Sequence, residues 1–155
     1  MKDFGVQYVY TSPLKRAYST AKILADKIGV ELEKLEDLFP LNNGIAEGKP
    51  YAFNKEVLGE ENYIKFKNSN ENGLDIVFPN GESRRSLRNK TKCAIEYICK
   101  NDKYDIVGVL THGDNLKELL HLYNFDNVSS IGNCEVIEAE YFENTGFKIV
   151  KRIKA

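Results

Sequence analysis

The segment VQYVYTSPLKRAYSTAKILADKIG, residues 6–29, decides the fold of this chain. Residues 6–10, VQYVY, consist mostly of Val and Tyr, which predicts a strand. Ser12 can cap a helix and Pro13 suits its first position. The apolar residues that follow at helical spacing, until Gly29 stops the run, are Leu14, Ala17, Ala21, Leu24 and Ile28. This pattern indicates a strand–turn–helix unit.

The rest of the chain predicts an α/β domain with a mostly parallel sheet flanked by helices and a C-terminal antiparallel hairpin. Residues 106–110, IVGVL, are apolar on both faces, as in a central parallel strand. The other expected segments are an irregular stretch over 30–48, one or two short helices over 51–66, a surface loop over 68–75, a long helix from the turn at 78–81 to about residue 100, a helix containing 116–123, and strands over 134–142 and 147–153.

Composition limits the classes of function that the chain can perform. A length of 155 residues predicts one domain over 1–155, with a cap or insertion at about 49–77. A net charge of −1 argues against nucleic acid or an anionic membrane as partner. We expect no signal peptide, and the three cysteines, Cys93, Cys99 and Cys134, indicate free thiols in a reducing cytoplasm. We expect no cofactor and no metal.

Two strand–helix junctions are candidates for chemistry, because ligands of open α/β sheets bind at the carboxyl ends of strands. Arg16 lies in the first turn after one junction, where the helix dipole disfavours a cation unless an anion binds there. His112 and Gly113 form the other junction, and Gly113 lets backbone N–H groups approach a ligand. We therefore expect Arg16 and His112 to converge on one anion. The alternatives are a solvated Arg16 and a His112 bonded to backbone.

Four motifs resemble those of the histidine phosphatase (phosphoglycerate mutase-like) superfamily. They occur along the chain in the same order as in that family. Residues 10–21, YTSPLKRAYSTA, resemble the family's Y-x-S-P-L-x-R-A-x-x-T-A segment. Residues 44–48, GIAEG, resemble its G-x-W-E-G loop with Ala46 in place of Trp. Residues 78–83, FPNGES, and residues 110–114, LTHGD, resemble its F-P-x-G-E-S and V-T-H-G-x motifs.

The resemblance implies roles for particular residues. Arg16, Ser12 and Gly113 would bind phosphate, and His112 would be the second histidine of the pocket. The family's general acid falls on Pro40, which carries no proton, so Glu82 or Glu47 is the possible surrogate.

The family's nucleophile, the His of an Arg-His-Gly strand end, has no counterpart, because these 155 residues contain no such tripeptide. The resemblance therefore implies a phosphoglycerate mutase-like three-layer fold without its first strand and helix. We expect this to leave a bare edge beside residues 107–110. Either the chain self-associates through it, the 134–153 hairpin covers it, a partner supplies the strand, or the gene product is N-terminally incomplete.

Three functions compete. The first is a phosphomonoester hydrolase or mutase that is incomplete, and therefore inactive, alone. The second is a non-catalytic pseudophosphatase that binds a phosphorylated small molecule or a protein. The third, a metal-dependent phosphoesterase using His112 and Asp114, is disfavoured because the chain has two histidines in all.

Overall fold

The computed structural model describes residues 4–68, 71–101, 103–125 and 130–153. Three strands form one parallel sheet in the order β2–β1–β3, and two more form a separate antiparallel pair. In chain order, the elements are β1 (Tyr8–Thr11), α1 (Lys15–Ile28), β2 (Glu31–Lys34), the 3-10 helices η2 (Glu36–Leu38) and η3 (Gly44–Ala46), α2 (Tyr51–Leu58), α3 (Glu60–Asn68), α4 (Arg84–Asn101), β3 (Val107–Leu110), α5 (Gly113–Leu122), β4 (Val136–Phe142) and β5 (Gly146–Ile153).

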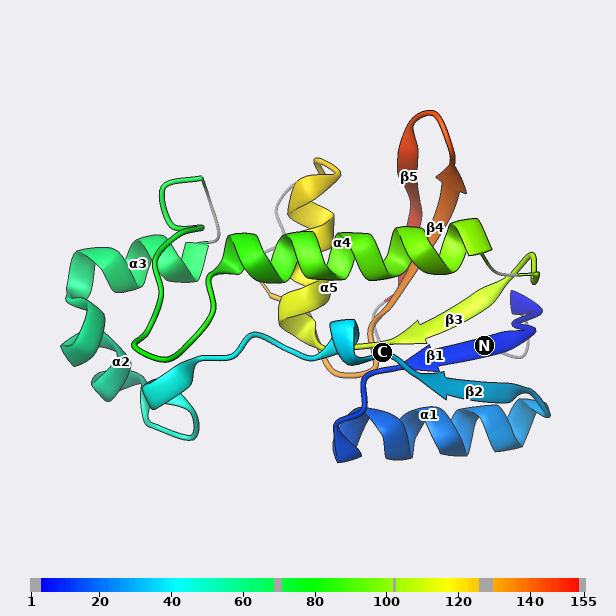
Figure 1. Cartoon of the computed structure of the whole chain (residues 1–155), viewed down its shortest axis with the longest axis horizontal. Coiled ribbons are helices and arrows are strands. Elements are labelled where there is room, and N and C mark those ends of the chain that lie inside the picture. The colour runs from blue at the N-terminus through cyan, green and yellow to red at the C-terminus, as the bar shows by residue number, and fades with distance from the viewer. Residues whose placement is uncertain (1–3, 69–70, 102, 126–129, 154–155) are drawn as a thin grey trace.

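Figure 1 shows α1 on one side of the parallel sheet and the long helix α4, with α5 behind it, on the other. Helix α1 packs closely because the residues that it buries are small: Ala17, Ala21 and Ala25. Gly29 ends it in the left-handed conformation, at φ 77°, as expected. Between α1 and the sheet, the apolar core packs Val9 on β1 together with Leu32 on β2 and Leu110 on β3.

Helices α2 and α3 occupy the region predicted as a cap and lie beyond the sheet, at the far end of α4 in Figure 1. They pack through a second apolar cluster, which contains Phe66, Phe78 and Leu87. Helix α2 buries none of its residues completely. Helices α2 and α3, called the cap below, are therefore both attached to the rest of the molecule through this cluster.

Three expectations about local structure are wrong. Residues 31–34 form strand β2, although the segment was expected to be irregular; only Leu32 of its ELEK sequence faces the core, so the apolar signal is one residue long. Within the surface loop predicted over 68–75, residues 71–75 do form turns, but the expected surface position is wrong for Leu74, which is fully buried; residues 69–70 lie outside the described residues. Ser12 does not cap α1, because the chain stays non-helical through Leu14 and the helix begins at Lys15.

Strand β3 lies at the edge of the described sheet, so the central position that its apolar sequence suggested is wrong, whereas the bare edge expected beside residues 107–110 from the family resemblance is present. Among the described residues it pairs with β1 alone, and β1 is the middle strand. Within the described residues, the hairpin of β4 and β5 pairs only with itself, so it does not cover the edge of β3, which was one of the alternatives. An apolar strand predicts burial by its faces, but it does not reveal how many of its edges are hydrogen-bonded.

Candidate functional site

Ser12 and His112 meet at the carboxyl ends of two adjacent parallel strands. The β1–β3 register pairs Thr11 with Leu110, and the backbone N–H of Ser12 donates to the Leu110 carbonyl at 2.9 Å. Each of these strands then leads into its helix at the same level of the sheet. The Nε2 atom of His112 consequently lies 2.8 Å from Oγ of the buried Ser12. Residues that are distant in sequence therefore form one polar site.

The failure of Ser12 to cap α1 leaves its hydroxyl available to this site. Besides its contact with His112, its Oγ accepts a long hydrogen bond, 3.4 Å, from the Leu14 N–H. Arg16 follows in the first turn of α1, exposed, with its own carbonyl bonded by Thr20. A cation at the amino end of a helix opposes the helix dipole, as the sequence indicated. The described contacts give its guanidinium no carboxylate partner that would compensate.

His112 is held in its neutral form. Burial, and then the positive charge of Arg16, lower the pKa of His112 from 6.5 to about 4, while Asp114 acts in the opposite direction. Arg16 therefore lies within electrostatic reach of His112. A neutral imidazole has one donor and one acceptor nitrogen, so it can bond Ser12 and still offer a second atom. A bound anion would raise the pKa of His112 and favour protonation of the ring.

A segment that follows β2 is anchored beside this site by α5 and by the end of β3. Thr111 Oγ1 donates to the Leu38 carbonyl at 3.0 Å, and Asn115 Nδ2 donates to the Phe39 carbonyl at 3.0 Å. Pro40 follows directly and is half-buried. The position that the family resemblance assigns to a general acid is thus next to the first turn of α5, but its side chain carries no proton.

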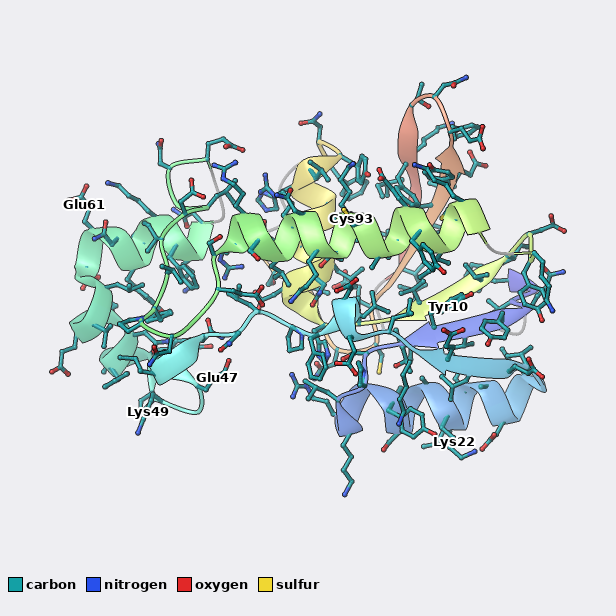
Figure 2. All side chains as sticks on the ribbon, viewed as in Figure 1. Tyr10, Lys22, Glu47, Lys49, Glu61 and Cys93 are labelled. Atoms are coloured by element: carbon teal, nitrogen blue, oxygen red, sulfur yellow. The ribbon has the colours of Figure 1, made fainter. Side chains whose placement is uncertain are left out.

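The two surrogate acids bond to loops rather than to the site residues. Glu82 accepts hydrogen bonds from the Asn42 N–H, from Ser86 and from Lys90. Glu47 accepts the Asn43 N–H at 2.8 Å, and Figure 2 shows it close to α2, at the cap end of the molecule. Within the described contacts, neither carboxylate is bonded to Ser12, Arg16 or His112.

Sequence reasoning missed a buried cluster of charges beside the site. Arg84 and Arg88 on α4 bond Glu118 on α5, which is fully buried, and Arg84 also bonds Asp114. A signal was nevertheless present, because the two arginines and the two acids are each four residues apart, so matched charges can meet between two helices.

A cavity in the described structure lies away from the residues of this site. It measures about 500 Å³ and opens between η2 and α4. Its lining residues are Leu35, Glu36, Asp37, Cys93, Ala94 and Tyr97. Across the parts of the chain that the structure describes, no three His, Cys, Asp or Glu side chains are grouped so that they could hold a metal ion. In the same parts, no helix is long and apolar enough to span a membrane.

The fold and the site define an α/β protein with a polar site at the carboxyl ends of parallel strands. The family model of the histidine phosphatase superfamily (branch 1) matches residues 1–152. The chain is 32% identical over 121 residues to phosphoglycerate mutase-like protein 4 of Arabidopsis thaliana, covering 76% of this chain and 50% of that protein. The chain therefore belongs to the histidine phosphatase superfamily.

Solved structures confirm the fold. The mycobacterial glucosyl-3-phosphoglycerate phosphatase in complex with inorganic phosphate matches with a TM-score of 0.77 at 16% identity, over 96% of this chain and 77% of that one. Phosphoserine phosphatase of Entamoeba histolytica, in complex with 3-phosphoglyceric acid, matches with 0.72 at 23% identity, over 99% and 76%. The chain spans between about half and two thirds of the length of the curated relatives it matches.

The protonation of His112 gives a direct test of this geometry. We expect its ring, followed by NMR, to titrate with a midpoint of about 4, and Arg16→Met to raise that pKa because a nearby positive charge is removed. The folded pKa lies below the value of 6.5 in an unfolded chain, so His112 destabilises the fold progressively as pH falls from 6.5 toward 4. If the His112 midpoint lies near 6.5 and is the same in Arg16→Met as in the wild type, the two residues do not share a site.

Proposed function

We propose that this chain carries the phosphate-binding half of a histidine phosphatase site, and that it binds a phosphorylated small molecule without turning it over alone. The observation that supports this most directly is the contact of His112 with Ser12, within electrostatic reach of Arg16. A phosphate there would accept hydrogen bonds from the Arg16 guanidinium and from the Ser12 hydroxyl. The backbone N–H of the exposed Gly113, at the amino end of α5, adds a further donor.

Inactivity follows from the two parts of the chemistry that this sequence does not supply. Phosphoryl transfer through a covalent intermediate needs a nucleophile and a proton for the leaving oxygen. The sequence offers no Arg-His-Gly, and Pro40 occupies the position of the acid. The carboxylates of Glu47 and Glu82 are already bonded to loop groups. We propose that the chain acts as a phosphoryl-transfer enzyme only if another segment or chain completes it, and otherwise as a pseudophosphatase.

Binding of inorganic phosphate distinguishes a phosphate site at Arg16 from a surface cation that is merely solvated. We expect calorimetry to detect phosphate binding that Arg16→Met weakens by about tenfold or more, since hydrogen bonds to charged groups contribute about 1.5–3 kcal/mol. Lys15→Met is the matched control, because Lys15 is an exposed cation in the same helical turn. It should change the affinity by less than about threefold.

The same preparations should release no phosphate from p-nitrophenyl phosphate above the buffer rate. Turnover that disappears with His112→Ala would contradict the proposed inactivity and show that this site carries out the reaction.

The edge of β3 is the proposed site of self-association. The carbonyls of Ile106 and Leu110 accept from Gln7 and Ser12 and so point toward β1. Because successive residues of a strand point to opposite edges, the N–H and C=O groups of Val107 and Val109 point away from β1. A bare edge of this kind pairs readily with another copy.

Sedimentation over a range of concentrations should therefore reveal dimers. Val109→Pro should abolish them without breaking the β1 ladder, since it removes an N–H that points outward. Val150→Lys, at a 48% exposed apolar position on β5, should leave them intact. A monomer at every concentration, with fast amide exchange at Val107 and Val109, would contradict self-association.

A further inference from the structure

Three parts of the molecule meet at the side chain of Arg84. Arg84 is the first residue of α4, and its side chain is only 7% exposed. Nε donates to the carbonyl of Phe66 on α3 at 2.8 Å, while Nη1 donates to Glu118 at 3.1 Å and to Asp114 at 3.2 Å. The guanidinium also stacks 4.5 Å from the centre of the Phe66 ring. One rigid planar group therefore holds the cap and α5 at once.

Lys117 makes a second link between the same two elements. It lies on α5, is only 9% exposed, and donates from Nζ to the Lys67 carbonyl at 2.8 Å. The last carbonyls of a helix have no partners within the helix, and the dipole makes that end negative. The carboxyl end of α3 is thus bonded by one cation from α4 and one from α5.

The acid side chains of α5 fix the position of this link. Glu118 is fully buried and accepts from Arg84 through one oxygen and from Arg88 through the other, so its carboxylate cannot turn without losing both. Asp114, one turn earlier, lies two residues from His112 and influences its pKa. A displacement of α3 would therefore also displace α5, the helix that begins at the proposed phosphate pocket.

We propose that Arg84 is a positioning residue that couples the cap, α2 and α3, to the amino end of α5, where His112 and Gly113 would bind phosphate. The inference rests on the proposed function, because the pocket at His112 is that of a phosphorylated ligand. A ligand held there by its phosphate would order α5, and Arg84 and Lys117 would transmit that order to the cap. The cap would then close on the organic part of a ligand only after its phosphate is bound.

Hydrogen exchange can measure this coupling without any ligand. Arg84→Lys keeps a cation beside Glu118, so the buried acid is not left unpaired, but an ammonium group cannot reproduce the planar fork. We expect amides of α3 and of residues 113–118 to exchange faster together, by about tenfold, as sub-global opening becomes easier. Lys117→Met should act in the same direction.

Arg85→Met is the matched control. Arg85 is the next residue, is 44% exposed, and bonds Glu71 and Asp75 but no residue of α5. It should leave exchange in 113–118 unchanged. Exchange in α3 that accelerates while 113–118 stays as in the wild type would overturn the coupling.

A second experiment measures the same coupling in the presence of inorganic phosphate. In the wild type and in Arg85→Met, phosphate should shift the His112 ring signals and slow exchange in α3. In Arg84→Lys the His112 signals should still shift, but exchange in α3 should no longer slow. An equal slowing in Arg84→Lys would overturn the proposal. If phosphate shifts no His112 signal, the pocket itself is contradicted, and the ligand-free comparison alone decides whether Arg84 couples cap and α5.

Discussion

The parallel pairing of β1 with β3 is the constraint on which the rest of the site depends. Its register sets Thr11 opposite Leu110, so Ser12 and His112 leave the sheet side by side and bond at 2.8 Å. The Thr11 carbonyl also accepts the Leu35 N–H, and Thr111 binds the Leu38 carbonyl, so the segment that leads to Pro40 is fixed to the ends of the same two strands. A shift of one residue in that register would turn either Ser12 or His112 to the opposite face and abolish the site.

A buried ionic cluster, in addition to apolar packing, joins the cap to this framework. Removing a carboxylate such as Glu118 from water costs several kcal/mol, and its bonds to Arg84 and Arg88 offset that cost only while their geometry is kept. Such a cluster contributes little net stability compared with an apolar replacement, but it tolerates few alternative arrangements. We interpret it as the feature that fixes the cap in one position relative to α5, whereas the apolar contacts of Phe66 and Phe78 would permit sliding.

Much of the fold and part of the candidate site could be predicted from the sequence, because the decisive signals are local. The turn after β1, the helix stop at Gly29, the long helix α4 and the histidine at the end of β3 each follow from a few adjacent residues, and the family from four motifs. The strand β2 could not be predicted, since Leu32 is its only core residue. The burial of Lys117 and Glu118 was missed because helical periodicity assigns charges to solvent. The apolar sequence of β3 suggested a central strand, because a local pattern does not record how many neighbours a strand has; its edge position followed only from the family resemblance.

The central claim is that Ser12, Arg16 and His112 form one oxyanion site, and a crystal structure of the protein with vanadate tests it most directly. The account predicts a single vanadate at the carboxyl ends of β1 and β3, with its oxygens about 3 Å from the Ser12 hydroxyl, the Arg16 guanidinium and a ring nitrogen of His112. A vanadate bound elsewhere, or an Arg16 guanidinium more than about 10 Å from the His112 ring and beyond the span of one anion, would contradict it.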